Sequence, residues 1–547
     1  MRIAGVIFAD FEESNPGGPS QLRTAIRGQT IIVRTLRRFA KIEGLCGRYL
    51  LVRPRDRDAG EEAIRTAGVG SEVQLLPADP GLRPARELVR TARKWALRSW
   101  RGNPLALTWF DEFVDPPTVA LVLDQVRCDA VLCLDGHMPL LDPVIGSAMV
   151  GHMVEHEAAC KVVFTQAPPG LAGVIIRREC AADLVKLAIP FGLLLSYRPE
   201  IAQSDPIIHP SCYHVPTVMV HTAGRFTADT RASRELVQAA IHELGDWALG
   251  PEVCHWYRKS RLGRPEALPN EVEIELTTDD PLPDTTLRPR GNRVPRRELS
   301  DLAAVDRIAA ELAEYDDRLV VLGGHGDPLS HSQFSQVVAR LRGAGVYGIA
   351  LVTPLLKLTD ENLDAIFAHH VDAIEVLLDA HSPVTYAQIH GINEYARVVS
   401  NISRLEEERR RRQSPWPVIV PSLIRCSATI AEMEEFYDHW IKSVGSAVIR
   451  GYRDYCGSWP PDSLLPTRPP VREHCRRLAT RMMLLADGNV PACSEDYRGE
   501  TSLGNWSALS LASIWNSDGF QSLRRAHAHL CLEAFPLCQR CGEWFRP

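Results

Sequence analysis

Six of the fourteen cysteines of this 547-residue chain lie in one stretch, between Cys456 and Cys541. Four of the six have a spacing that suits a metal centre: Cys475, Cys493 and the CxxC pair Cys538 and Cys541. A CxxC places two thiolates on one tight turn, and the fold must bring the other two to the same centre. Four thiolates suit a structural zinc ion or an iron–sulfur cluster, and the spacing alone does not separate these two centres.

The two distant thiols need a structural element that brings them in. The segment 483–496 predicts a hairpin with Asp487 and Gly488 at its turn, because Asp-Gly is a favoured two-residue turn. A zinc ribbon more often has two CxxC knuckles, whereas this stretch has one. The two remaining cysteines of the stretch, Cys456 and Cys531, are predicted to be structural rather than ligating.

The cysteine pattern resembles that of a known domain. Cys475, Gly488 and Cys493 form C-x12-G-x4-C, and LGNWSALSLASIWNSDGFQSLRRAH and PLCQRC follow. This order is similar to the SPASM domain and its shortened twitch form, which follow radical-SAM barrels and carry auxiliary [4Fe–4S] clusters. The resemblance implies one such cluster here, with Cys475, Cys493, Cys538 and Cys541 as ligands. A full SPASM domain has further cysteines for a second cluster, whereas this chain ends six residues after Cys541.

The residues before this tail predict a partial barrel. Strand and helix patterns alternate over residues 269–465, which is typical of a parallel sheet covered by helices. Six parallel strands joined by crossover helices suit a partial (β/α)6 barrel. The predicted strands are 272–278, 318–324, 346–353, 371–379, 417–424 and 446–452.

Two strand ends of this barrel resemble the radical-SAM family. The second strand ends in LGGHGDPLS, which is similar to the glycine-rich turn that takes the methionyl amine of S-adenosylmethionine, and the fourth ends in VLLDAHSPVTYAQIHG. Glycine allows close backbone approach to a ligand, and a carboxylate accepts hydrogen bonds from an ammonium group. The resemblance implies a cofactor turn made of Gly323, Gly324, Gly326 and Asp327.

The cysteine motif of that family is missing from the barrel. Radical-SAM enzymes have a CxxxCxxC loop directly after the first strand, where this chain has Asp280, Asp284 and Leu287. No cysteine lies between Cys254 and Cys426, so no shift of register restores the motif. Carboxylates are hard ligands that match an iron–sulfur cluster poorly. We therefore expect a polar loop or a divalent-cation site here, and reductive cleavage of S-adenosylmethionine to be lost even if that molecule still binds.

The first 225 residues alternate strands and helices in the same way. The opening RIAGVIFADFEESNPGGPSQLRTAIRGQTIIVRTLRRF resembles nucleotidyltransferases of the cytidylyltransferase, GT-A-like type, in which a strand leads to a Gly-rich basic loop. CLDGHMPLLDPVIGSAMV resembles their element with a metal-binding aspartate, here with His137 in its place and Asp135 two residues before. The loop is acidic, with Asp10, Glu12 and Glu13, and would repel a triphosphate. We expect sugar or nucleotide binding rather than nucleotidyl transfer.

Composition narrows the range of partners. The net charge is −6, with 45% hydrophobic and 24% charged residues, which is ordinary for a globular protein and indicates no nucleic-acid partner. No apolar run reaches membrane-spanning length, and the N-terminus lacks the pattern of a signal peptide. We therefore expect a cytoplasmic α/β protein without a membrane partner. Its predicted segments are a GT-A-like domain (1–225), a helical connector (226–268), the partial barrel (269–465) and the iron–sulfur domain (466–547).

These features favour an iron–sulfur protein of the radical-SAM/SPASM family that has lost its catalytic cluster. Its expected role is binding a small molecule or a protein partner, or electron transfer. Three alternatives stay open: an active radical-SAM enzyme with an unusual cluster site, a nucleotidyltransferase acting on an activated sugar, and a structural zinc protein.

Overall fold

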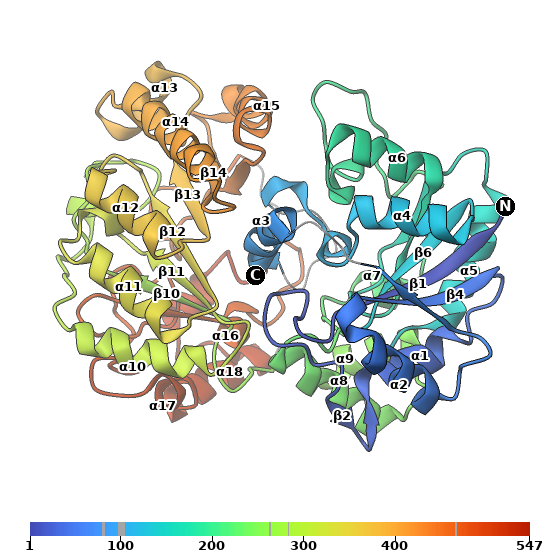
Figure 1. Cartoon of the computed structure of the whole chain (residues 1–547). Helices are drawn as coiled ribbons and strands as arrows, with labels where there is room; N and C mark the ends of the chain where they lie inside the picture. Colours follow the sequence, from blue (N-terminus) through green and yellow to red (C-terminus); the bar gives the residue numbers. More distant parts are fainter. Residues whose placement is uncertain (79–82, 97–103, 262–263, 283, 465–467, 547) are drawn as a thin grey trace. The chain divides into compact units, whose positions relative to one another are not determined.

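The structure is a computed structural model that divides into two compact units, Met1–Leu262 and Gly263–Pro547 (Figure 1). No helix of the described residues is long and apolar enough to cross a membrane. The described residues are 1–78, 83–96, 104–261, 264–282, 284–464 and 468–546.

The first unit is built on a seven-stranded mixed sheet in the order β5-β4-β1-β6-β8-β7-β9. Strands β5, β4, β1 and β6 are parallel, whereas β8 runs antiparallel to both β6 and β7. The predicted alternation of strands and helices is thus observed, and the antiparallel strand is an addition that the pattern did not indicate. The strands are β1 (Ile3–Ala9), β4 (Gly47–Val52), β5 (Gln74–Pro77), β6 (Ala130–Asp135), β7 (Val162–Thr165), β8 (Val174–Arg177) and β9 (Cys212–Tyr213).

The helices of the first unit cover a core centred on β1 and β6, which are apolar along nearly their whole length because both faces of the sheet are covered. The helices α8 and α9, in the segment predicted as a connector, add Val237, Ile241 and Val253 to this core. The main helices are α1 (Ile31–Phe39), α2 (Arg57–Ala67), α3 (Arg83–Arg93), α4 (Pro116–Val126), α5 (Pro143–Glu155), α6 (Arg178–Leu187), α8 (Arg231–Leu244) and α9 (Gly250–Ser260).

The second unit has a seven-stranded sheet that is parallel throughout, in the order β15-β14-β13-β12-β11-β10-β16. All six predicted barrel strands are confirmed, and a seventh comes from the cysteine-rich tail. The strands are β10 (Glu271–Glu275), β11 (Leu319–Gly323), β12 (Gly348–Thr353), β13 (Ala373–Leu377), β14 (Val418–Arg425), β15 (Val448–Gly451) and β16 (Arg481–Leu484).

Helices follow the strands of this sheet and lie along its outer side (Figure 1). Because the strands are parallel, their carboxyl ends meet at one edge, and the glycine turn after β11 and the loop after β10 therefore share that edge. The helices are α10 (Leu302–Ala313), α11 (Phe334–Ala344), α12 (Asp360–Ala368), α13 (Pro383–His390), α14 (Tyr395–Arg411) and α15 (Met433–Val444).

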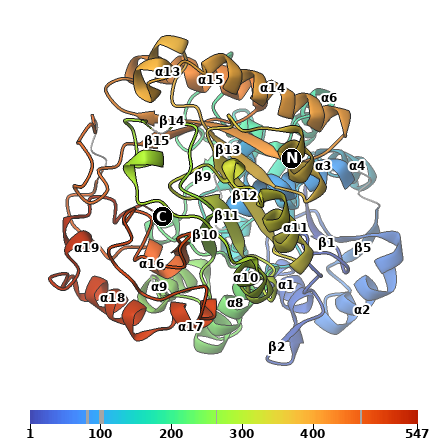
Figure 2. The ribbon, with the colours of Figure 1, turned by 90° about the vertical axis from the view of Figure 1, so that its left-hand side faces the viewer.

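The C-terminal tail is part of the same unit and shares the barrel's core. The predicted turn at Asp487 and Gly488 is present: Leu485 N donates to Asn489 O at 2.9 Å, and Gly488 has a φ of +91°. The hairpin prediction is wrong in its pairing, however, because β16 adds to β10 in parallel and the chain beyond the turn pairs with residues 503–505. Figure 2 shows the helices of the tail, of which α16 precedes β16 and the others follow the turn. These are α16 (Arg477–Thr480), α17 (Leu511–Trp515), α18 (Asp518–His529) and α19 (Pro536–Arg540).

Candidate metal centre

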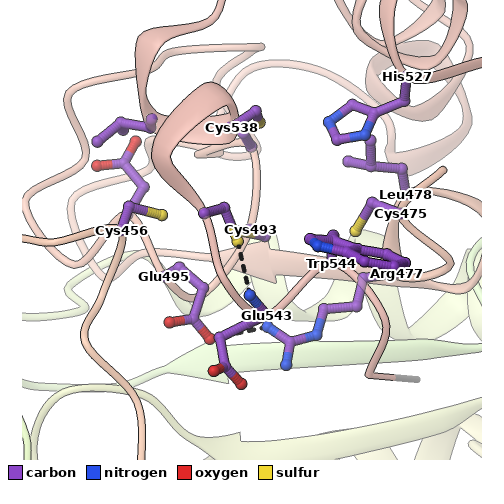
Figure 3. A pocket seen from close by; sticks show the side chains of 14 residues that line it. Cys456, Cys475, Arg477, Leu478, Cys493, Glu495, His527, Cys538, Glu543 and Trp544 are labelled. Carbon is purple, nitrogen blue, oxygen red and sulfur yellow. Dashed lines mark hydrogen bonds and ion pairs between the residues drawn. The ribbon is translucent and has the colours of Figure 1, made fainter. Parts of the chain in front are cut away.

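The four thiols that the sequence analysis singles out line one cavity in the tail (Figure 3). They come from three segments: Cys475 precedes α16, Cys493 follows the turn after β16, and Cys538 and Cys541 belong to α19 and its end. All four are free thiols of intermediate exposure. The cavity thus gathers donors that are far apart in the sequence.

Local contacts hold these segments together. Arg472, just before Cys475, donates from Nη2 to Cys538 O at 2.5 Å and so joins the two ends of the site. Glu543 N donates to Cys541 Sγ at 3.2 Å, a contact that stabilises a thiolate. Gly488 is required at the turn, because a side chain there would meet Asn505 Oδ1 at 2.9 Å.

A fifth thiol, Cys456, lines the same cavity. Its sequence position predicts a structural role, yet its thiol shares the cavity with Cys541 and lowers the pKa of that residue. Tyr455, Cys456 and Gly457 all have positive φ values, of +46°, +59° and +75°, so a strained loop at the barrel exit holds this thiol in place. No spacing rule marks Cys456, because its contact with Cys541 exists only in the folded chain.

One histidine also lines the cavity. His527 of α18 is 3% exposed, and neither of its ring nitrogens has a hydrogen-bond partner among the described residues. The sequence around His527 gave no signal that it belongs to the site. The helical spacing of Phe520, Leu523 and His527 places all three on the buried face of α18, but this spacing shows burial and not chemistry.

Buried charges lie beside the thiols. Glu495 accepts from Arg477 Nη1 at 2.8 Å and from Arg453 Nη1 at 3.2 Å. Burial alone would raise the pKa of Glu495, but the two guanidinium groups lower it, so the carboxylate is charged. Burial and the charge of Glu495 raise the pKa of Cys493, and the charge of Arg477 offsets this only in part.

Three of the four thiols, those of Cys475, Cys493 and Cys538, have raised pKa values. Burial raises the pKa of Cys538 to about 12 and that of Cys493 well above its usual value. Only Cys541 has a lowered pKa, and the cause is the neighbouring thiol of Cys456. Since thiolates are the metal-binding form, loading this site releases protons.

The donor set fits a soft metal centre, because thiolates suit zinc and iron–sulfur clusters. Over the described part of the chain, no group of three or more histidine, cysteine or acidic side chains is arranged to hold a single metal ion. The thiols instead surround a cavity (Figure 3), an arrangement that suits a centre of several metal ions.

The predicted cofactor turn at the barrel mouth has a different environment. Gly324 has a φ of +88°, and its N–H donates to Glu273 Oε1 at 3.0 Å. Arg290 donates from Nη1 to Gly324 O at 3.1 Å and from Nη2 to Gly326 O. Gly323 ends β11, and a side chain on it would meet Val352 at 3.3 Å. Two carbonyls of the predicted cofactor turn therefore already accept from a guanidinium of the same chain.

Asp327, the predicted carboxylate of this turn, is fully buried. Its Oδ1 accepts from Thr353 Oγ1 at 2.7 Å and from Leu329 N at 3.2 Å. Burial, helped by the nearby charge of Asp280, raises the pKa of Asp327 to about 7.

The three residues at the register of the missing cysteines do not converge. Asp280 is buried and accepts from Arg290 Nε at 2.6 Å, Asp284 is exposed, and Leu287 belongs to an apolar cluster. Asp280 is thus neutralised by an arginine, and the three side chains form no common site.

Acidic side chains in the loop after β1 of the first unit also form ion pairs. Asp10 forms ion pairs with Arg53 at 2.6 Å and with Arg86 at 3.0 Å, so its charge is compensated by arginines that follow it in the chain. His137 is buried beside Asp135, with Nδ1 and Oδ1 3.3 Å apart. Burial would lower the pKa of His137, but Asp135 raises it overall.

Comparison with protein families gives a match in the tail. Residues 475–542 match the family model SPASM, described as an iron–sulfur cluster-binding domain. The matched segment contains the four predicted ligands and does not reach the barrel or the first unit. The tail is therefore similar to an iron–sulfur cluster-binding domain.

A curated relative and several solved structures are similar to the chain. An uncharacterized protein of Treponema pallidum (strain Nichols) is 26% identical over 329 residues, which are 57% of this chain and 82% of that protein. A structure of BtrN in complex with AdoMet and 2-DOIA is 16% identical, with a TM-score of 0.34, and covers 50% of this chain and 93% of that one. Streptococcus suis SuiB bound to precursor peptide SuiA is 12% identical, with a TM-score of 0.41 and coverages of 53% and 78%. A cytidylyltransferase from Leptospira borgpetersenii is 14% identical, with a TM-score of 0.33 and coverages of 47% and 94%.

Proposed function

We propose that the tail binds one [4Fe–4S] cluster through Cys475, Cys493, Cys538 and Cys541. The observation that carries this proposal is that the four thiols line a single cavity, within the segment that matches the cluster-binding family. Four protein thiolates occupy all four irons of such a cluster, so no iron is left open for a substrate. When bound, the cluster supplies one-electron chemistry, and we propose electron transfer to a partner as its role.

We propose further that the barrel does not cleave S-adenosylmethionine. No cysteine lies in the loop after β10, and Asp280 of that loop is paired with Arg290. The same arginine donates to the carbonyls of Gly324 and Gly326. The barrel in this proposal is a scaffold whose mouth is filled by its own side chains.

The first unit is proposed to bind a sugar or a nucleotide near the end of β6. The supporting observation is that Asp135 Oδ2 is buried and has no hydrogen-bond partner among the described residues, as expected of an atom that awaits a ligand or cation. Thermal unfolding with and without CTP and Mg²⁺ tests this proposal. A rise in the midpoint that is lost in Asp135→Asn is the expected result, and no rise with any nucleotide or sugar nucleotide contradicts it.

The cluster proposal is tested with matched cysteine variants of the whole chain, purified without oxygen. Cys538→Ala removes a proposed ligand, whereas Cys531→Ala changes an exposed thiol that does not line the cavity. We expect the visible absorption and the iron content to be lost in Cys538→Ala and kept in Cys531→Ala. Equal iron content in both variants would contradict the assignment of this ligand.

A further inference from the structure

The unpaired histidine in the cavity is the feature that the four-thiolate site leaves unexplained. His527 is 3% exposed, lines the same cavity as the five thiols, and has no partner at either ring nitrogen among the described residues. Figure 3 shows its ring directed into the cavity, on the side of Cys538 and Cys475.

Such an arrangement is costly unless something fills the cavity. A buried polar group without a hydrogen bond destabilises the folded chain, and an apolar side chain at this position would avoid that loss. Buried polar atoms in native proteins are nearly always paired, so an unpaired one marks the place of a water, an ion or another group. His527 has two such atoms, and both belong to one ring in the cavity.

The helix that carries this ring is held firmly. Phe520 and Leu523 are fully buried on the same face of α18, and the Ser517 side chain caps its first turn. Arg524 donates to Leu478 O at 2.9 Å and to Trp515 O at 2.7 Å, which ties α18 to the wall of the cavity. The ring is therefore positioned by the packing and the hydrogen bonds of its helix. It has no polar partner of its own among the described residues.

The His527 ring can donate one hydrogen bond when it is uncharged. Burial, together with the nearby Arg472 and His474, lowers the pKa of His527 to about 4. At neutral pH the imidazole is uncharged, so one ring nitrogen carries a proton and the other a lone pair. The ring thus offers one N–H to whatever occupies the cavity.

We propose that His527 donates this N–H to a sulfur of the bound cluster and thereby sets its reduction potential. The proposal rests on the cluster assigned to the cavity above. His527 is a positioning residue in this account, since the four thiolates hold the irons and the imidazole acts on them through sulfur. A hydrogen bond to sulfur stabilises the more negative, reduced cluster, so it raises the potential.

Three variants separate the effect of the N–H donor from the effect of side-chain volume. His527→Leu fills the space without a donor, and His527→Gln restores an N–H. His529→Leu changes an exposed histidine of the same helix and serves as the control. Iron and sulfide are counted first in every variant, and the midpoint potential is then measured by a redox titration followed by electron paramagnetic resonance.

We expect all four proteins to keep their cluster. His527→Leu should shift the one-electron reduction equilibrium about tenfold toward the oxidised form, which corresponds to a potential about 59 mV lower. His527→Gln should recover most of this shift, and His529→Leu should match the wild type.

The outcomes separate the two proposals. Absence of a cluster from the wild type would overturn the proposed function itself. An intact cluster with the same potential in His527→Leu would overturn only the role of His527 and would assign the unpaired nitrogens to an ordered water. A nitrogen bound directly to iron, seen as a strong ¹⁴N coupling that His527→Gln removes, would also overturn hydrogen-bond donation to sulfur.

Discussion

The cysteine cavity and the barrel mouth lie in the same unit, and they differ in chemistry: the mouth contains buried ion pairs, and the cavity gathers thiols. At the mouth, Arg290 pairs with Asp280, and Arg297 forms hydrogen bonds of 2.6 and 3.1 Å with Glu275. In the cavity, neither ring nitrogen of His527 has a partner among the described residues, and at the mouth Asp327 Oδ2 and His325 Nε2 are likewise buried without one. Ion pairs within the chain hold the loops of the mouth, whereas the thiolates proposed as ligands in the cavity need a metal centre to hold them.

This difference explains how the loop after β10 is held in place without a metal centre. A loop with three cysteines needs a cluster to neutralise and fix its thiolates. Here Arg290 bridges the carboxylate of Asp280 and the carbonyls of Gly324 and Gly326, so the loop after β10 is fixed to the turn after β11 by the chain itself. The glycine turn therefore serves the packing of the mouth.

The largest expected effect concerns the fifth thiol of the cavity. Because Cys456 lines the same cavity as Cys541, we expect it to take over the iron of Cys541 when that residue is changed. Cys541→Ala should therefore keep more iron than Cys538→Ala, and the double variant Cys456→Ala/Cys541→Ala should lose the cluster completely. Iron and sulfide counts after oxygen-free purification measure this. Equal loss from both single variants would show that Cys456 cannot act as a ligand.

The ion pair at the barrel mouth gives the next largest effect. Arg290→Met leaves Asp280 buried without its partner, which typically costs about 3–5 kcal/mol of unfolding free energy. The exposed pair of Arg340 and Asp306 provides the control, and Arg340→Met should leave stability unchanged. Urea unfolding of the two variants measures both values. Similar stabilities would mean that the mouth is not held by internal pairing.

A smaller effect is expected from pH at Asp327. Its pKa is raised from 3.8 to about 7 in the folded chain, so the folded state binds the proton more tightly than the unfolded state. The resulting stabilisation is complete below pH 4 and is lost as the pH rises through 7. Asp327→Asn keeps an acceptor for Thr353 and removes this loss. Its melting temperature relative to the wild type should therefore be higher at pH 8 than at pH 5, and a constant difference would refute the burial argument.

No effect at all is expected from S-adenosylmethionine. Since Arg290 already occupies the carbonyls of the glycine turn, calorimetric titration of the whole chain should give no binding heat. Incubation under reducing conditions should give no 5′-deoxyadenosine. Binding in the micromolar range would show that Arg290 can be displaced and that the mouth is a ligand site after all.

The sequence was sufficient for features that depend on local pattern. The six barrel strands followed from apolar runs separated by helical segments, and the four thiols at the cavity followed from their spacing. The parallel addition of β16 to β10 was missed, because Asp487 and Gly488 signal a turn but not the partner of the strand before it.

Features that depend on distant contacts could not be predicted. Cys456 reaches the cavity through a loop with positive φ values, and His527 through the packing of α18, neither of which has a spacing signature. Arg290 was visible in the loop after β10, but its role depends on the fold bringing that loop beside Gly324 and Gly326. The sequence pattern therefore does not show which polar residues far apart in the chain contact one another.

The central claim is one cluster in the tail and none in the barrel, and its most direct test is the metal content of the whole wild-type chain. Iron, acid-labile sulfide and zinc are measured after purification without oxygen. The account predicts about four irons and about four sulfides per chain, the content of one [4Fe–4S] cluster. About eight irons would contradict the loss of the barrel cluster, and one zinc without iron would contradict the iron–sulfur assignment of the cavity.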